Sequence, residues 1–276
     1  MKSLDGKVVA ITGAGSGIGR ALALDAAGRG ALLAISDWDA DALAGTVDLL
    51  KAAGVSELRS DLLDVADRIA MAEWATAVAA QFGRVNVLVN NAGVTVTGDF
   101  EDMSYADFDW IVGVNLMGVV QGTKEFLPHL IASGDGHLVT ISSLFGLVSM
   151  PGQSAYNATK YAVRGFTEAI REEMLVHGHP VGVTCVHPGG IRTGISRNGR
   201  KNAGLDAEAI DRLFEDKLAT MPPDRAAEII LDAILKGKAR VLVGLDAHVI
   251  HHLAKLSGSY YQDVVARLRR KSGPRH

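Results

Sequence analysis

The 276-residue sequence is poor in several features, and each shortage excludes a class of protein. It holds a single cysteine, Cys185, so no disulfide can form within the chain, which fits a reducing compartment. Because no His–carboxylate pattern surrounds it, Cys185 is expected to be a small buried apolar residue. No apolar run reaches the ~20 residues that a membrane-spanning helix needs. The net charge is −3, without an excess of Lys and Arg, so nucleic acid is not an expected partner.

Targeting and metal-binding patterns are also missing. Residues 1–15 hold an early lysine and a short apolar run broken by glycines, which is not the pattern of a signal peptide. A cytoplasmic protein with no membrane partner is therefore expected. Nine histidines occur, but neither His177 and His179 nor the adjacent His251 and His252 have the spacing of a known zinc site, so no metal is expected.

What the sequence does contain is an alternation of short apolar runs with helical patterns. The expected strands cover residues 7–12, 31–36, 56–64, 85–90, 137–142, 181–186 and 240–244. The expected helices cover about 18–30, a segment ending near 53, 66–82, 104–132 and 153–177, with more helical pattern after about 205. Continuous apolar strands separated by helices indicate a parallel sheet covered on both faces. Since no break in composition divides the chain, a single doubly wound α/β domain over residues 1–276 is expected.

The first expected strand leads directly into the glycine-rich stretch "TGAGSGIGR", residues 12–20, and then into a helix. Gly13, Gly17 and Gly19 permit a tight turn and a close approach of the backbone to a diphosphate. The N-terminus of the helix supplies free N–H groups and a positive dipole. A strand, glycines and a helix in this order predict a dinucleotide site, which glycines alone would not.

An acidic residue ends the second expected strand. Asp37 lies 18 residues past Gly19, about where a carboxylate accepts hydrogen bonds from the adenosine ribose of a dinucleotide. The alternative is a helix cap or turn former within "SDWDAD". The glycine turn upstream favours the ribose role and hence NAD, with NADP left open.

Four separated stretches occur in the order of one known family: "TGAGSGIG" (12–19), "NNAG" (90–93), "YNATK" (156–160) and "PGGIRT" (188–193). On these motifs the sequence resembles the classical short-chain dehydrogenase/reductase family over about residues 5–245. The resemblance implies a seven-stranded, mostly parallel Rossmann sheet in the order 3-2-1-4-5-6-7. It also implies a nicotinamide-dependent oxidoreductase.

The family motifs identify the expected site residues one by one. Catalytic residues implied by the resemblance are Asn115, Ser143, Tyr156 and Lys160. Expected cofactor contacts, with the glycine turn and Asp37 included, are Gly13, Ser16, Gly17, Ile18, Gly19, Asp37, Asp64, Val65, Asn91, Ala92, Gly93, Tyr156, Lys160, Pro188, Gly189, Ile191 and Thr193. Expected substrate contacts are Ser143, Phe145, Gln153 and Tyr156.

Tyr156 and Lys160 are four residues apart in a helical pattern, so both side chains leave the same face. A free tyrosine has a pKa near ~10, and a neighbouring ammonium group is expected to lower it toward the range of a useful base. Tyr156 would then exchange a proton with a substrate oxygen, while Ser143 stabilises charge on that oxygen. The family pattern further implies that Asn115 holds a water on a proton path to Lys160.

Each of these residues also has an ordinary structural interpretation. Tyr156 and Lys160 could form a helix-surface contact, Ser142 and Ser143 could end a strand, and Asn115 could be a polar residue within a helix. At the level of function, two alternatives stay open. One is a dinucleotide-binding sensor or scaffold without turnover, and the other is an epimerase or dehydratase of the same fold.

Substrate specificity is expected in loops beyond the carboxyl ends of the strands. Those positions are Leu144, Phe145, Met150 and Gln153, followed by a lid over about residues 190–220 with Ile195, Leu213, Phe214 and Leu218 on its inner face. Their apolar character favours a hydrophobic, bulky ketone or secondary alcohol. The sequence does not identify which one, nor the direction or stereochemistry of the reaction.

Two expectations concern the outside of the molecule. The family resemblance implies a homotetramer or homodimer assembled through helices 104–132 and 153–177, with Val163 and Phe166 as contacts. The C-terminal extension, about 246–276, ends in the basic stretch "ARLRRKSGPRH". A solvated tail is expected there, and attraction to anionic lipid is the alternative.

Overall fold

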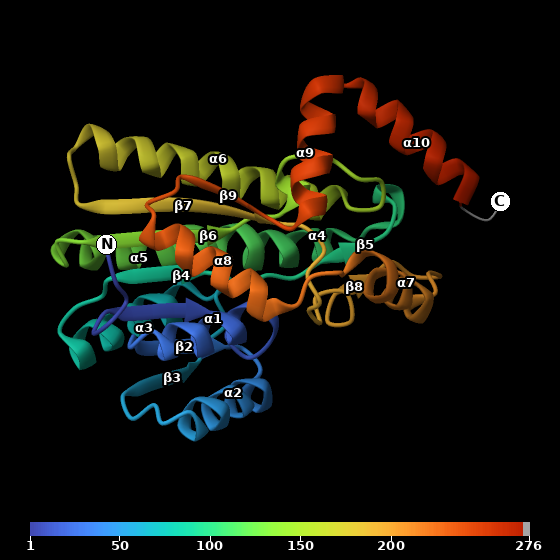
Figure 1. Cartoon of the computed structure of the whole chain (residues 1–276). Coiled ribbons are helices and arrows are strands. Elements are labelled where there is room, and N and C mark those ends of the chain that lie inside the picture. The colour runs from blue at the N-terminus through green and yellow to red at the C-terminus, as the bar shows by residue number, and fades with distance from the viewer. Residues whose placement is uncertain (273–276) are drawn as a thin grey trace.

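The computed structural model describes residues 1–272, except for the side chains of residues 215, 217, 271 and 272. Seven strands form one sheet in the order β3-β2-β1-β4-β6-β7-β9, and every neighbouring pair is parallel (Figure 1). Its strands are β1 (Val8–Thr12), β2 (Leu32–Asp37), β3 (Leu58–Leu62), β4 (Val87–Asn90), β6 (Gly136–Ile141), β7 (Val181–Pro188) and β9 (Arg240–Val243). The predicted Rossmann sheet and its strand order are confirmed.

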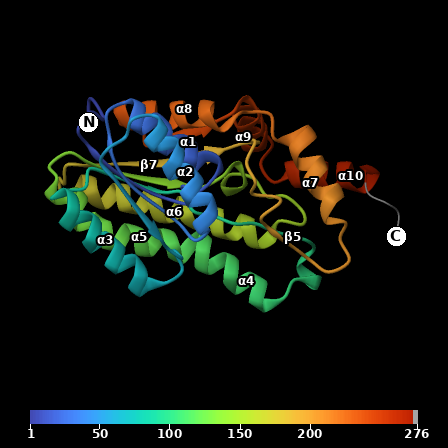
Figure 2. The same cartoon turned by 90° about the horizontal axis from the view of Figure 1, so that it is seen from below.

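Helices cover both faces of this sheet (Figure 2). The α-helices are α1 (Gly17–Gly28), α2 (Ala40–Ala52), α3 (Arg68–Phe82), α4 (Tyr105–Val112), α5 (Gly118–Ala132), α6 (Ser154–Val176), α7 (Ala207–Leu213), α8 (Pro223–Leu235), α9 (Leu245–Ser257) and α10 (Tyr260–Ser272). Single turns lie at η1 (Phe100–Asp102), η2 (Gly113–Met117), η3 (Leu144–Gly146) and η4 (Phe214–Leu218). Helices α1, α2 and α8 pack on one face, and α3, α5 and α6 pack on the other. No helix within residues 1–272 combines the length and apolar composition that crossing a bilayer requires.

Local sequence explains where several helices begin. Asp39, Asp67, Ser104 and Asp206 each precede a helix, and each accepts a hydrogen bond from an N–H of its first turn. Such caps satisfy N–H groups that have no partner inside the helix. Helix α1 differs, because within the described residues the Ser16 side chain makes no capping hydrogen bond. The first turn of α1 is therefore available to a ligand.

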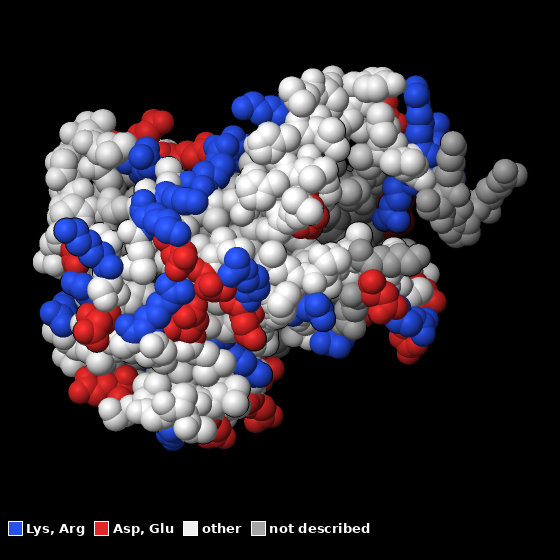
Figure 3. Space-filling view, in the orientation of Figure 1, with Lys and Arg blue, Asp and Glu red and all other residues white. Residues whose placement is uncertain are grey.

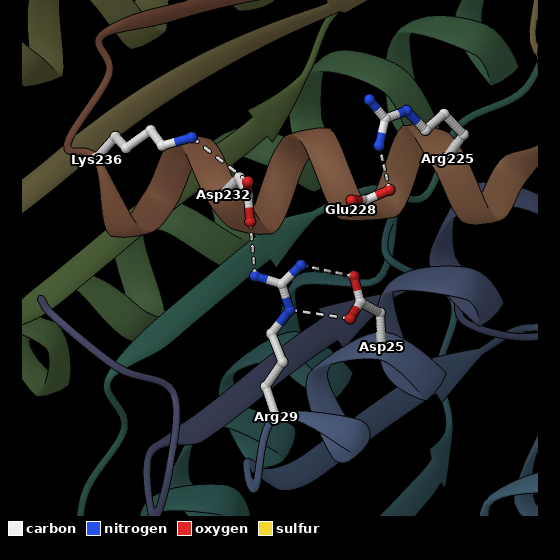
Figure 4. A network of polar contacts seen from close by, with 6 residues as sticks. All are labelled: Asp25, Arg29, Arg225, Glu228, Asp232 and Lys236. Carbon is white, nitrogen blue, oxygen red and sulfur yellow. Dashed lines mark hydrogen bonds and ion pairs between the residues drawn. The ribbon is translucent and has the colours of Figure 1, made fainter.

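Helices α1 and α8 lie side by side and are joined by ion pairs (Figure 4). Arg29, just past the end of α1, donates to both carboxylate oxygens of Asp25 at 2.9 and 3.0 Å. Its third bond, also 2.9 Å, reaches Asp232 of α8, which Lys236 approaches at 3.4 Å. These contacts raise the pKa of Arg29, chiefly through the hydrogen bond to Asp25. They hold α8 beside α1, and so fix the position of the helix that follows residues 190–222.

The long helix expected over 104–132 is interrupted by one wide turn. Between α4 and α5, residues Gly113–Met117 form a π-helical turn with Asn115 at its centre. Such turns are rare and often occur at functional sites. A second feature absent from the prediction is the two-residue parallel pair β5 (Val96–Thr97) and β8 (Arg200–Lys201), which ties the expected lid segment to the loop after β4.

One expected subunit contact is wrong. Val163 is fully buried within the chain, because its position on α6 faces the sheet. It therefore cannot touch another subunit. Phe166 is half-buried and stays a candidate contact, and the homotetramer or homodimer stays a prediction.

Candidate active site

Tyr156 and Lys160 lie in the first two turns of α6, with both side chains directed inward. The Lys160 ammonium is 5.6 Å from the centre of the Tyr156 ring. Lys160 Nζ also donates a 3.0 Å hydrogen bond to the carbonyl of Ile141, at the end of β6. Both side chains are buried, which excludes the ordinary helix-surface pair.

Ser143 follows β6 in an extended conformation and faces the same place. Its Oγ accepts a 3.1 Å hydrogen bond from the N–H of Phe145, which orients the hydroxyl. It lies close enough to the Tyr156 hydroxyl to lower the pKa of that phenol. The structure thus brings Ser143, Tyr156 and Lys160 together from two elements that meet at the carboxyl edge of the sheet.

Asn115 is completely buried in the π-helical turn. Its Oδ1 accepts from the N–H of Val94 at 2.8 Å, and its Nδ2 donates to the Val94 carbonyl at 2.9 Å. Nδ2 also approaches Thr159 Oγ1 at 3.3 Å. The side chain therefore fixes the loop after β4 to α6. The water that the family pattern implies at Asn115 stays a prediction.

The two ionisable groups have pKa values shifted mainly by burial. Burial raises the pKa of Tyr156 to about 12, although the hydrogen bond to Ser143 lowers it. Burial likewise lowers the pKa of Lys160 to about 8. The expectation of a lowered tyrosine pKa is wrong for the protein without ligand. The physical reason is that the phenolate loses its hydration in the buried site, and this loss raises the pKa by more than Ser143 lowers it.

At neutral pH the geometry therefore presents a phenol next to an ammonium ion. A phenol donates a proton to a developing alkoxide, and the ammonium then stabilises the phenolate that remains. This arrangement is suited to the reduction of a carbonyl group. Oxidation requires additional positive charge nearby to form the phenolate first.

The glycine turn between β1 and α1 is closely surrounded by backbone. A Cβ at Gly19 would overlap the carbonyl oxygen of Gly13, and Gly13 itself has a φ of +67°. Asn91 secures the turn by donating from Nδ2 to the carbonyls of Thr12 and Gly13 at 2.9 and 3.0 Å. A glycine-rich turn beside the uncapped start of α1 forms a cradle that fits a diphosphate.

Asp37, the last residue of β2, lies at the edge of this turn. Its Oδ2 accepts from the N–H of Gly15 at 2.7 Å, and its Oδ1 accepts from the N–H of Asp39 at 3.0 Å. The second bond is the turn-forming role considered as an alternative. The bond from Gly15 holds the carboxylate at the glycine turn. The turn-forming role of Asp37 is therefore compatible with the expected ribose role. Trp38 follows and is 75 % exposed.

Other expected cofactor contacts lie in the first turn of α1 and in the loops after β3 and β4. Gly93 lies beside Lys160 and Asn115, because a Cβ there would be 3.3 Å from Lys160 Nζ and 3.4 Å from Asn115 Oδ1. Ile18 is half-buried in the first turn of α1, and Ala92 donates its N–H to Thr12 Oγ1 at 3.1 Å. Asp64 is exposed and Val65 is buried against Gly118.

The loop after β7 returns across the glycine turn. The methyl group of Thr193 is 2.9 Å from where a Cβ of Gly17 would stand. Gly189, the residue after Pro188, donates its N–H to the Val243 carbonyl at 2.8 Å. The Ile191 side chain is buried in the core, so only its backbone can contact a cofactor. The cofactor contact of Ile191 stays a prediction.

Comparison with known proteins agrees with this geometry. The family model described as short chain dehydrogenase matches residues 7–204. The chain belongs to the short chain dehydrogenase family. SadH of Mycobacterium tuberculosis, named as an oxidoreductase, is 54 % identical over 266 residues, 96 % of each chain. C alpha-dehydrogenase of Sphingobium sp. is 38 % identical over 240 residues, which cover 83 % of this chain and 78 % of that protein.

A solved structure of the family has the same fold. A short chain dehydrogenase/reductase from Burkholderia phymatum in complex with NAD superposes with a TM-score of 0.87 at 32 % sequence identity. The match covers 93 % of this chain and 95 % of the other. The protein is therefore an oxidoreductase of the short chain dehydrogenase family.

An apolar wall surrounds Tyr156 in this short chain dehydrogenase. Phe145 meets the Tyr156 ring edge-on, with 6.2 Å between ring centres, and Ile195 packs in the same cluster. Both were expected from the sequence. The side chains from η1–α4 were missed, although their apolar spacing was visible: Met103, Phe108 and Trp110.

Two expected substrate positions make structural contacts, and the substrate role of Gln153 stays a prediction. Leu144 is buried beneath α9 with Val148 and Ala247, so it does not line the pocket. The Gln153 amide accepts from Thr95 Oγ1 at 3.1 Å and donates to Thr97 Oγ1 at 2.9 Å. Gln153 therefore connects the start of α6 to β5.

The expected lid is more structured than its glycines indicate. Residues 190–220 contain β8, α7 and η4, and Leu213 and Leu218 are partly exposed there. Met150, in the loop before α6, donates its N–H to Asn157 Oδ1 at 3.1 Å. Closure of this segment over a substrate stays a prediction.

His187 holds the backbone of Ser143 in place, a role that was not predicted from the sequence. It is fully buried on β7, and its Nδ1 lies 3.0 Å from the carbonyl oxygen of Ser143. Burial lowers the pKa of His187 to about 4, so the ring is neutral and Nδ1–H donates. A second buried ring, His137, also has a pKa lowered to about 4 by burial, with Nε2 2.8 Å from Thr184 Oγ1.

We expect these two histidines to make stability fall in acid. Both folded-state pKa values lie below the ordinary 6.5, so the unfolded chain takes up protons between pH 6.5 and 4 that the folded protein does not bind. The free energy of unfolding therefore decreases as pH falls through this window, by on the order of 3 kcal/mol per histidine. Urea unfolding of His137→Gln should show a shallower pH dependence. The exposed His177→Gln control should follow the unmodified protein, and identical slopes in all three would contradict the assignment.

Proposed function

We propose that this protein is an NAD(H)-linked oxidoreductase that interconverts a hydrophobic secondary alcohol and the corresponding ketone. The observation that carries the proposal is the convergence of Ser143, Tyr156 and Lys160 beside a glycine cradle. A protein that only binds a dinucleotide has no use for a phenol, a hydroxyl and an ammonium ion gathered in one site. The NAD-bound relative and the relative named C alpha-dehydrogenase support the cofactor and the reaction class.

The roles follow from the positions of the groups. When bound, the nicotinamide supplies or accepts the hydride. Ser143 Oγ–H donates a hydrogen bond to the substrate oxygen and holds it beside the Tyr156 hydroxyl. Tyr156 gives its proton to that oxygen in reduction and takes it back in oxidation. Lys160 stabilises the phenolate, and Asn115 keeps the loop after β4 in register with α6.

The proposed substrate class rests on the apolar wall. Phe145, Ile195 and Trp110 form apolar surroundings for Tyr156. In these surroundings, Ser143 and Tyr156 are the polar groups proposed to bind a reacting oxygen. We therefore expect kcat/KM to rise with the apolar size of a ketone series, since each buried CH₂ contributes ~0.8 kcal/mol. Steady-state kinetics with aliphatic and aryl ketones test this. Equal or better turnover of small, polar ketones would contradict the substrate class.

We expect a preference for NAD(H) over NADP(H). A 2′-phosphate would bring negative charge against the Asp37 carboxylate, and each unit pair at ~4 Å repels by ~4 kcal/mol at an effective dielectric of ~20. Screening reduces this to roughly 1.5–3 kcal/mol, which corresponds to about 10–100-fold in affinity. Asp37→Ser combined with Trp38→Arg should shift kcat/KM toward NADP(H). Asp41→Ser, an exposed carboxylate on α2, is the control. Unmodified enzyme that favours NADPH would contradict the ribose role of Asp37.

A further inference from the structure

The C-terminal extension is a pair of helices attached beside the catalytic serine loop. Helix α9 packs against Leu144 and Val148, and the Tyr261 hydroxyl of α10 accepts a 2.9 Å hydrogen bond from the N–H of Ser149. From there α10 extends away from the body of the molecule (Figure 1). The extension is thus fixed at its root, next to the loop that follows Ser143, and exposed along its outer side.

The outer side of this extension is apolar. We define the C-terminal stripe as six exposed apolar side chains of the two helices: Leu245, Val249, Leu253 and Leu256 on α9, and Tyr260 and Val264 on α10. They recur every three or four residues, which places them on one face of each helix. Leu245, Leu253 and Leu256 are 80 %, 61 % and 86 % exposed. A largely uncharged surface covers α9 in Figure 3.

Charge is distributed unevenly between the extension and the rest of the chain. Residues 245–276 contain six Lys and Arg against two Asp, a net charge of +4. Because the whole chain carries −3, residues 1–244 carry −7. Arg267, Arg269 and Arg270 of α10 are exposed within one turn of the helix. The stripe therefore lies next to a cluster of cations on an otherwise acidic protein.

We propose that the C-terminal stripe and the α10 arginines dock this protein on the surface of an anionic lipid bilayer. A helix with an apolar face and adjacent basic residues lies in the plane of a membrane interface, where acyl chains meet the apolar side and headgroups meet the cations. A bilayer satisfies both features at once. The helices lie on the membrane and do not cross it.

The main competing occupant is a second copy of the chain. A two-fold contact between stripes would press two extensions of net charge +4 against each other, which like-charge repulsion disfavours. Exposed apolar side chains elsewhere, such as Trp38, Ile69 and Phe100, lie on separate elements and offer no matching stripe. Charge thus favours lipid. Docking also places the loop that follows Ser143 beside the bilayer. Delivery of a lipid-dissolved substrate to that loop rests on the proposed function, whereas membrane binding itself does not.

The test is sedimentation of the full chain with vesicles, which requires no turnover. Binding is expected to phosphatidylcholine vesicles that contain phosphatidylglycerol, and to be much weaker with phosphatidylcholine alone. Leu253→Ser combined with Leu256→Ser should lower the partition coefficient about 10-fold or more. The control is Leu175→Ser with Val176→Ser on α6, which removes side chains of matched exposure, 62 % and 80 %. That control should bind as the unmodified chain does.

The arginines are tested separately. Replacing Arg267, Arg269 and Arg270 by Gln should weaken binding to the anionic vesicles roughly 100-fold and flatten its salt dependence. Absence of binding, or equal binding by the stripe variant and its control, would overturn the proposal. Sedimentation velocity separates the rival: if the stripe variant dissociates an oligomer and vesicles are not bound, a second copy covers the stripe.

Discussion

Tyr156→Phe is expected to lower kcat by at least ~10²-fold while the affinity for NADH changes little. The substitution keeps the ring, and therefore its edge-on contact with Phe145, but removes the oxygen that exchanges the proton. Lys160 would keep its hydrogen bond to the Ile141 carbonyl, so the site should stay folded. Steady-state kinetics give kcat, and a fluorescence titration gives the affinity for NADH.

Tyr105→Phe is the matched control for this variant. Tyr105 begins α4 and is almost fully exposed, so the loss of its hydroxyl should leave kcat unchanged. Retention of more than about a tenth of the activity by Tyr156→Phe would remove this residue from the acid–base role.

Gly19→Ala is expected to have the second large effect, on cofactor binding and on stability. An alanine Cβ would overlap the Gly13 carbonyl oxygen and approach Asn91 Nδ2. Because the obstacle is backbone, the turn must open, and overpacking of this kind costs about 1–3 kcal/mol or more. NADH affinity should fall at least about 10–100-fold. The free energy of unfolding should fall by a similar energy, measured by urea titration.

The same helix offers a matched control. Gly28 ends α1 and has no neighbouring atom within 4 Å of the position of a Cβ. Gly28→Ala should leave NADH affinity unchanged and stabilise the protein by about 0.5–1 kcal/mol, since alanine is favoured over glycine in a helix. If Gly19→Ala also behaved in this way, the turn between β1 and α1 would not be the tight cradle described.

The sheet was predictable because its central strands, β1, β4, β6 and β7, are buried on both faces. Buried parallel strands appear in a sequence as continuous apolar runs, and "KVVAIT" and "VGVTCV" are of this kind. The two-residue strands β5 and β8 have no such run. Their pairing depends on Gln153 and on the loop after β4, far apart in the sequence, so local pattern could not predict it.

The site was predictable in its residue types but less so in its packing. The motifs placed Ser143, Tyr156 and Lys160, whose proximity the structure shows. Leu144 and Val163 were misplaced because the elements that cover them, α9 and the sheet, come from distant parts of the chain. The direction of the Tyr156 pKa shift was wrong for a related reason, since a sequence does not give the depth of burial that outweighs a nearby charge.

The central claim is tested most directly by following NADH absorbance while the unmodified protein is mixed with a panel of hydrophobic ketones. The account predicts that NADH is consumed with at least one of them, and that chromatography recovers one secondary alcohol per NADH oxidised. The account would be contradicted if the protein bound NADH but no ketone in the panel consumed it, and if no matching alcohol produced NADH from NAD.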